Sequence, residues 1–218
     1  MKNPELNYWN HRLAKVKESL EDNNFEVYIA ENADAARDIA LNEIIGGLDN
    51  VQTVSWGGSM TFIGTGLFHI LKDDEKYDVI NTFDKSIPPE EQLERRRKSL
   101  HSDLFLTGTN AITEDGKLVN LDMIGNRIGA ITFGPRYVII LVGRNKICCD
   151  LDDAMYRIKN YAAPVNTMNL DMKTPCSKSG FCHDCHSPSR ICNTWTITEK
   201  SFPPKRVKII LINEDLGF

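Results

Sequence analysis

Four of the six cysteines of this 218-residue chain fall in one short stretch near its end, TPCSKSGFCHDCHSPSRICN, residues 174–193. They are Cys176, Cys182, Cys185 and Cys192. The central C-x-x-C pair can bring two thiolates to one site from a tight turn, and the outer cysteines, on loops, can complete a set of four. Four thiolates suit an iron–sulfur cluster or a tetrahedral zinc ion.

The spacing of these cysteines leaves more than one cofactor open. It is not the C-x₂-C-x₂-C run of bacterial ferredoxins, and it lacks the paired C-x-x-C knuckles of common zinc ribbons. A [4Fe–4S] or [2Fe–2S] cluster, a structural zinc ion, and free thiols or a redox disulfide all fit it, and chance clustering is the remaining alternative. His183 and His186 are expected beside the site rather than as ligands. Cys148 and Cys149 follow an apolar stretch and are expected to be structural.

Composition and charge narrow the class of protein. Apolar residues make up 41% of the chain and charged residues 26%, as in globular domains with a sizeable core. The net charge of −4 argues against a general nucleic-acid binder, which is usually basic. The polar N-terminus has no apolar region of a signal peptide, and no stretch approaches the roughly 18 apolar residues of a membrane span. We therefore expect a cytoplasmic protein, in which clustered cysteines favour metal or redox roles over disulfides.

Hydrophobic periodicity predicts strands that alternate with helices. The expected helices cover 4–23, 33–45, 60–71, 87–100 and 150–160. The expected strands cover 25–30, 51–56, 77–81, 104–108, 118–121, 136–142 and 207–212, with a hairpin turn at 114–116. This alternation predicts an α/β fold with a central, mostly parallel sheet flanked by helices. We expect one domain, 1–218, in which the cysteine-rich segment is an insertion before the last strand.

Two loops that follow predicted strands could bind a small anionic organic ligand. The first, SWGGSMT, contributes Gly57, Gly58, Ser59 and Thr61, and its glycines let the backbone approach a ligand closely. It is neither a G-x-G-x-x-G fingerprint nor a P-loop, so nucleoside triphosphate chemistry is not expected. The second, TGTNAITEDGKLVNLDMIGNR, contributes polar side chains at strand ends, where open α/β sheets bind ligands. They are Asn110, Glu114, Asp115, Asn120 and Arg127. The arginine could bind a carboxylate or pair with Asp122.

Three segments together resemble the LUD-domain family of lactate-utilisation proteins. They are GGSMT after a strand, TGTNAITEDGKLVNLDMIGNR, and GPRYVIILVGRNKI before a helix. The resemblance covers roughly residues 5–163 and continues to Leu216 when the cysteine segment is included. It implies a fold similar to the NagB/RpiA/CoA-transferase-like superfamily, which agrees with the pattern of strands and helices.

The resemblance also implies a function. Some family members resemble subunits of an L-lactate oxidation complex, in which LUD domains occur alone or beside iron–sulfur domains. That context favours a [4Fe–4S] cluster on the four cysteines, protein partners in a redox complex, and a role in the utilisation of lactate or another 2-hydroxy acid. Whether the chain is itself an enzyme stays open.

Two alternatives remain. Related folds bind phosphorylated or CoA-linked ligands at the glycine turn, so the chain could be a CoA-transferase-like enzyme with a structural zinc ion. In that case Gly57, Gly58, Ser59 and Thr61 match the ligand loop, and Asn110, Glu114, Asp115 and Asn120 match the facing loop. CoA-transferases use a glutamate nucleophile, for which Glu114 is the candidate. The chain could also be a non-catalytic assembly or regulatory module, because it has no HExxH motif and no serine–histidine–aspartate arrangement.

Overall fold

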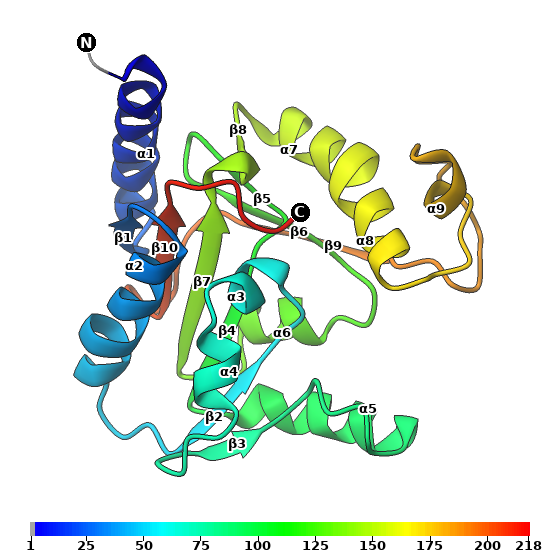
Figure 1. The fold of residues 1–218 in the computed structure, drawn as a ribbon, viewed down its shortest axis with the longest axis horizontal. Helices are drawn as coiled ribbons and strands as arrows, with labels where there is room; N and C mark the ends of the chain where they lie inside the picture. The colour runs from blue at the N-terminus through cyan, green and yellow to red at the C-terminus, as the bar shows by residue number, and fades with distance from the viewer. Residues whose placement is uncertain (1–2) are drawn as a thin grey trace.

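The computed structural model describes residues 3–218 and has a layered α/β architecture (Figure 1). The helices are α1 (Pro4–Asp22), α2 (Ala33–Asp38), α3 (Met60–Gly64), α4 (Leu67–Leu71), α5 (Pro89–Lys98), α6 (Asn126–Thr132), α7 (Leu151–Arg157), α8 (Ala163–Asn169) and α9 (Cys176–Ser179). The strands are β1 (Glu26–Ala30), β2 (Thr53–Trp56), β3 (Asp78–Ile80), β4 (Leu104–Gly108), β5 (Ala111–Thr113), β6 (Leu118–Asp122), β7 (Tyr137–Gly143), β8 (Ile147–Cys148), β9 (Thr194–Thr198) and β10 (Val207–Ile212). Short 3₁₀ and π turns are η1 (Ile39–Ile44), η2 (Ile45–Gly47), η3 (Ser99–His101), η4 (Arg144–Lys146) and η5 (Ile158–Ala162).

Six strands form the central sheet, in the order β1-β10-β7-β4-β2-β3. Every pairing in it is parallel, which confirms the predicted parallel sheet. Helices cover both faces, so the strands at the centre of the sheet are shielded from water on both sides. The long apolar run of β7 reflects this double burial.

Two hydrophobic cores lie on the two faces of this sheet. Ile139 and Leu141 of β7 pack into one core with residues of α2, α3 and α4. Val138 and Ile140 point the other way and pack into a second core with residues of α1 and α6. The side chains of a strand alternate between faces, so one strand serves both cores.

Helix α1 shows how local sequence sets an element. The Asn3 side chain accepts a hydrogen bond from the Leu6 amide at 3.1 Å, and Pro4 occupies the first turn, where its missing N–H costs nothing. Leu13, Val16 and Leu20 form the buried stripe of the helix. The predicted helix over 4–23 is confirmed.

A second, four-stranded sheet in the order β8-β5-β6-β9 was predicted only as its β5–β6 hairpin. Gly116 occupies the hairpin turn with a φ of +83°, which glycine tolerates best. β9 pairs antiparallel with β6, and helix α7 packs on this sheet. The strand β9 escaped prediction because its five residues are all half-buried or exposed.

Two helical predictions differ from the structure, and one helix was not predicted. The predicted helix over 60–71 is divided into α3 and α4 at Gly66, whose φ of +78° ends the first segment. The apolar stretch 128–133, to which no element was assigned, lies largely within α6. The predicted helix over 150–160 continues through η5 into α8, which ends at Asn169.

The cysteine-rich segment follows α8 and carries the four-residue helix α9, which projects at one end of the molecule (Figure 1). β9 lies between this segment and the last strand, β10. Within residues 3–218, no helix has the length and hydropathy that a bilayer span requires.

Candidate functional site

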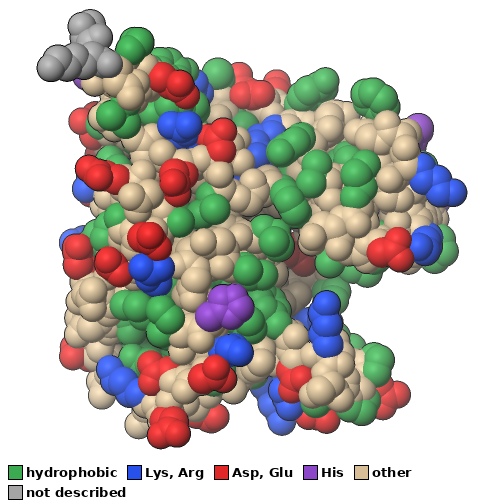
Figure 2. All heavy atoms as spheres, in the orientation of Figure 1, with side chains coloured by type: hydrophobic (Ala, Val, Ile, Leu, Met, Phe, Trp, Pro, Cys, Tyr) green, Lys and Arg blue, Asp and Glu red, His purple; other side chains and the backbone are tan. Residues whose placement is uncertain are grey.

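A cleft of about 540 Å³ opens at the carboxyl ends of the parallel strands. Its floor contains Ser59, Asn110 and Lys146, which follow β2, β4 and β7. One wall includes Arg96 of α5, and the opposite wall includes Asn166 of α8. Figure 2 shows the cleft as a deep notch between the part of the molecule that carries α5 and the part that carries α8 and α9.

The order of the strands explains why the cleft lies there. From β2 the chain adds β3 on one side and then returns to add β4 on the other side of β2. The loops after β2 and β4 therefore leave the sheet toward opposite faces, and a crevice remains between them. Ligands of open α/β sheets bind in such a crevice.

The glycine turn after β2 packs tightly against the end of β4. Gly57 donates a hydrogen bond from its amide to the carbonyl of Leu106 at 3.0 Å, and Ser59 Oγ accepts one from the Phe62 amide at 3.1 Å. A Cβ atom at Gly108 would lie 2.4 Å from Ser59 Oγ, so only glycine fits at the end of β4. These contacts fix the position of the glycine turn relative to the end of β4.

Arg127 organises the second predicted loop. Its Nε donates to Asp122 Oδ2 at 3.0 Å, Nη1 donates to the carbonyl of Gly108 at 3.1 Å, and Nη2 donates to Asn110 Oδ1 at 2.8 Å. The Arg127 and Asp122 side chains are 9% and 10% exposed, so this is a buried ion pair. Pairing with Asp122 was one of the two roles that the sequence offered. The guanidinium fixes Asn110 and Asp122 in the lining of the cleft.

Lys146 joins the two loops from below. Its Nζ donates to Thr61 Oγ1 at 2.8 Å and to the carbonyl of Thr109 at 3.2 Å. Lys146 is 4% exposed and lines the cleft. Burial, together with the positive charges of Arg157 and Arg127, lowers the pKa of Lys146 to about 7. The floor of the cleft thus disfavours the charged form of the Lys146 side chain.

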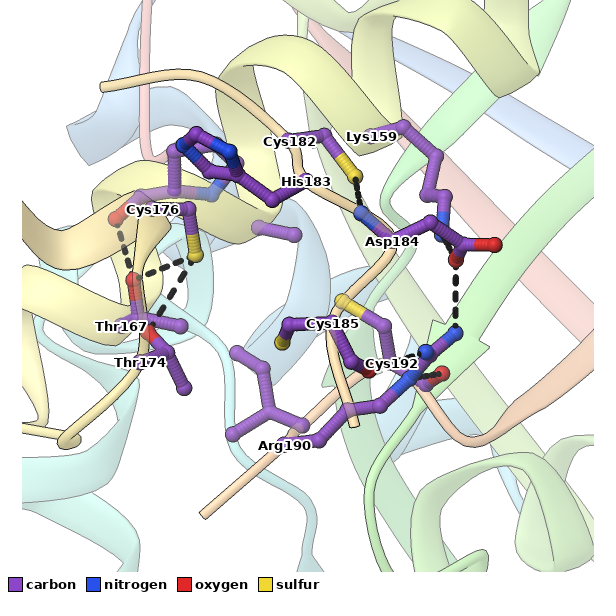
Figure 3. A pocket seen from close by; sticks show the side chains of 13 residues that line it. Lys159, Thr167, Thr174, Cys176, Cys182, His183, Asp184, Cys185, Arg190 and Cys192 are labelled. Carbon is purple, nitrogen blue, oxygen red and sulfur yellow. Dashed lines mark hydrogen bonds and ion pairs between the residues drawn. The ribbon is translucent and has the colours of Figure 1, made fainter. Parts of the chain in front are cut away.

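The four clustered cysteines line a second, smaller pocket (Figure 3). Figure 3 shows the side chains of Cys176, Cys182, Cys185 and Cys192 around one common space. All six cysteines of the chain are free thiols. The pocket has a volume of about 20 Å³, roughly room for one water molecule.

Positive charge borders the cysteine pocket. Lys159 Nζ and Arg190 Nη2 both bind Asp184 Oδ1, at 2.8 and 3.1 Å. The amide of Asp184 donates to Cys182 Sγ at 3.4 Å. Burial raises the pKa of the Cys192 thiol, while the charges of Lys159 and Arg190 act against that rise. Cations and N–H donors of this kind stabilise thiolates.

The cysteines do not form the ligand shell of a single ion. In the described part of the chain, no three His, Cys, Asp or Glu side chains are grouped so that they could hold a metal ion. A tetrahedral zinc site needs all its sulfur atoms about 2.3 Å from one point. The four thiols share a pocket but do not meet at such a point.

The cysteine pocket and the large cleft share a wall. Ile191 lines both, while the next residue, Cys192, lines the cysteine pocket. On the helical side, Ala162 lines the cleft and the adjacent Ala163 lines the cysteine pocket. The two candidate sites are therefore neighbours, although they come from separate predictions.

Comparison with known proteins assigns the family. The LUD domain matches residues 13–212, nearly the whole chain. The chain belongs to the LUD domain family. A DUF162 family protein from Deinococcus radiodurans, known from a crystal structure, is similar at 15% sequence identity, with 94% of this chain and 98% of that chain covered and a TM-score of 0.49. No curated protein matches the chain.

In this LUD domain the predicted ligand residues fall into three groups. Gly58, Ser59, Asn110 and Arg127 line the cleft. Gly57, Thr61 and Asn120 lie just behind its lining: a Cβ atom at Gly57 would meet Arg127 Cγ at 3.1 Å, Thr61 binds Lys146, and Asn120 Oδ1 accepts from Arg127. Glu114 and Asp115 do not line it.

Glu114 and Asp115 have partners of their own at the β5–β6 turn. Glu114 pairs with Arg12 at 2.9 Å and with Lys15 at 3.2 Å, both on α1. Asp115 pairs with Lys117. The two ion pairs of Glu114 fasten the hairpin to the first helix, and both carboxylates lie outside the lining of the cleft.

Sequence reasoning passed over Lys146, the buried cation of the site. Its signal was a lysine close behind the apolar strand 136–142, where polar residues at strand ends face ligands. The same argument singled out Asn110. Of the two histidines between the cysteines, His183 lines the cysteine pocket and binds Ser179 Oγ through Nε2 at 2.7 Å.

Proposed function

We propose that this LUD domain protein is an iron–sulfur redox subunit that takes part in the utilisation of lactate or another 2-hydroxy acid. The observation that carries the proposal is the wall shared by the two sites, where Ile191 faces both the cleft and the cysteine pocket. An organic acid in the cleft would then lie one side chain away from a redox centre. Electrons would pass on to protein partners, and we place this complex in the cytoplasm.

The donor set of the cysteine pocket fits an iron–sulfur cluster. Cys176, Cys182, Cys185 and Cys192 would each supply a thiolate, and the Asp184 amide already points at one of the sulfur atoms. A cluster is wider than one ion, so it accepts thiolates that do not converge on a single point. When bound, such a cluster supplies one-electron transfer.

The small volume of the cysteine pocket requires its loop to move outward around a cluster. The segment that carries these cysteines has little regular structure apart from the four residues of α9. It is tied to the rest of the fold by side-chain contacts such as Lys159 to Asp184, and at its end by the hydrogen bond from the Asn193 amide to the Asp122 carbonyl of β6.

The charges of the cleft support an anionic ligand. Lys85, Arg96 and Lys146 line it, and within residues 3–218 none of them forms an ion pair with a carboxylate. The carboxylate of Asp122 is already paired with Arg127. The cleft therefore presents net positive charge, which attracts carboxylates and phosphates.

The test is metal analysis after anaerobic purification. The wild type should contain about four iron and four sulfide per chain, as expected for a [4Fe–4S] cluster. Cys185→Ser should lose most of both. The matched control is Cys149→Ser, which changes an exposed cysteine outside the pocket and should keep its iron.

Other results would refute the proposal or favour one of the alternatives. An iron-free wild type, or equal iron in Cys185→Ser, would refute the redox proposal. One zinc per chain would make the cysteine pocket a structural site. The cleft would then be the whole functional site, as in the CoA-transferase-like alternative.

A further inference from the structure

The cleft is large for a three-carbon acid. Cavities of about 300–1,000 Å³ usually hold ligands of drug size, and this one measures about 540 Å³. Lactate alone would leave most of that space to water. The dimensions of the cleft indicate a longer ligand than the family name implies.

Lys146 marks the part of the cleft floor that should receive an acidic group. Its ammonium has three N–H donors, of which Thr61 Oγ1 and the Thr109 carbonyl accept two, at 2.8 and 3.2 Å. Across the part of the chain that the structure describes, no carboxylate lies within ion-pair distance of it. A buried cation without a counter-charge is costly, and an anionic ligand would remove that cost.

The rest of the cleft offers apolar surface. The side chains come from α3, from the end of β6 and the loop after it, from the residue after α8, and from the shared wall: Met60, Ile63, Leu121, Ile124, Leu170 and Ile191. Met60, Ile124 and Leu170 are 36%, 49% and 51% exposed, so they stand open for a ligand to cover. Covering apolar surface stabilises a complex by roughly 25 cal/mol per Å².

We propose that the cleft binds a 2-hydroxy or 2-oxo acid whose side chain is larger and more apolar than the methyl group of lactate, with its carboxylate on Lys146 Nζ. The assignment rests on the proposed function only for the 2-hydroxy acid class. The carboxylate takes the free N–H of Lys146, and the side chain lies along the apolar wall. Lys146 is then the residue that selects for charge, and the wall selects for size.

The test is calorimetric titration of the full chain with lactate, 3-phenyllactate and the neutral amide of 3-phenyllactate. Phenyllactate should bind at least about tenfold more tightly than lactate, because its ring covers apolar surface that a methyl group cannot reach. The amide should bind at least about tenfold more weakly than phenyllactate. Inorganic phosphate is the fourth probe, and it should compete only weakly with phenyllactate, because it covers none of the apolar wall.

Three variants separate charge from folding. Lys146→Met and Lys146→Gln should both lose at least about tenfold in affinity for phenyllactate, with melting temperatures confirming that they fold. Lys72→Met changes a lysine of the same charge that pairs with Asp73 away from the cleft, and it should bind like the wild type. Ile63→Trp should weaken the binding of phenyllactate more than that of lactate, because the larger side chain narrows the cleft beside its apolar wall.

The inference is overturned if lactate binds as tightly as phenyllactate, if the amide or phosphate is preferred, if the Lys146 variants bind normally, or if no acid binds the wild type. Iron measured in the same samples separates it from the proposed function. Tight binding of phenyllactate to iron-free wild type would refute the redox role and leave this assignment standing. Full iron content with no acid binding would refute this assignment and leave the iron–sulfur cluster standing.

Discussion

Ile191 and Cys192 are consecutive residues that belong to different sites, since Ile191 lines both the cleft and the cysteine pocket and Cys192 lines the pocket alone. The backbone between them is therefore the boundary between a place for an organic ligand and a place with four thiols. Ile191 is 7% exposed, so it acts as a packed partition rather than an open channel. The account of function depends on this adjacency.

The buried pair of Arg127 and Asp122 should be essential to the fold of the cleft. Arg127→Met leaves the Asp122 carboxylate buried without its partner, which costs about 3–5 kcal/mol of unfolding free energy. Urea denaturation measures that loss. The double variant Arg127→Met with Asp122→Asn should lose less than the sum of the two single changes. Simple additivity would show that the pair is not coupled.

The contact between the two loops makes a prediction about Gly108. Gly108→Ala places a methyl group 2.4 Å from Ser59 Oγ and 3.2 Å from the Leu141 carbonyl. We expect it to displace the Ser59 cap of α3, which costs about 0.5–2 kcal/mol, and to weaken ligand binding in the cleft.

Gly58→Ala is the control for Gly108, because a Cβ atom at Gly58 meets nothing within 4 Å. Its stability, measured by thermal unfolding, should stay within about 0.5 kcal/mol of the wild type. Equal losses from both alanines would contradict the tight contact at Gly108.

The central strand β7 should carry a large share of the stability. Ile140→Ala removes buried methyl groups from the core shared with α1, at an expected cost of about 2–5 kcal/mol. Ile70→Ala changes an isoleucine that is 43% exposed and should cost far less. Chemical denaturation of both variants at one pH decides the matter, and comparable losses would mean that the core is assigned wrongly.

Lys146 should make stability depend on pH in a defined window. Its pKa is about 7 in the folded chain and near 10.5 when unfolded, so the unfolded state binds the extra proton between these values. Wild-type stability should therefore rise between pH 7 and pH 10.5 relative to Lys146→Met, by at most about 1.4 kcal/mol per pH unit. Below pH 7 the difference between the two proteins should be constant.

Denaturation of the wild type and Lys146→Met across this range tests that prediction. Other groups, such as Tyr28, whose pKa burial raises to about 12, act equally in both proteins and cancel in the comparison. Parallel stability curves from pH 7 to 10.5 would show that Lys146 keeps its ordinary pKa.

Much of the fold could be read from the sequence because its signals are local. The cap and amphipathic pattern of α1, and the continuous apolar run of β7, each predict the element from its own residues. The β9 strand could not be read, because its pairing with β6 depends on residues distant in the sequence. The break at Gly66 was missed because glycine inside a helical pattern is often tolerated.

The candidate site was predictable to a similar degree. Loops after strands pointed to Ser59 and Asn110, and both line the cleft. Glu114 follows the same kind of pattern, but its position on the hairpin brings it to Arg12 on α1 instead. Proximity of this kind is set by tertiary packing, which no local pattern encodes. The common pocket of the cysteines followed from their clustering alone.

The measurement that tests the central claim most directly is the reduction potential of the proposed iron–sulfur cluster, titrated anaerobically with and without a 2-hydroxy acid. An anion bound behind Ile191 disfavours the added electron, so the potential should fall when the acid is present and should not move in Lys146→Met. A protein with no reducible cluster, or a potential that ignores the acid, would contradict the account.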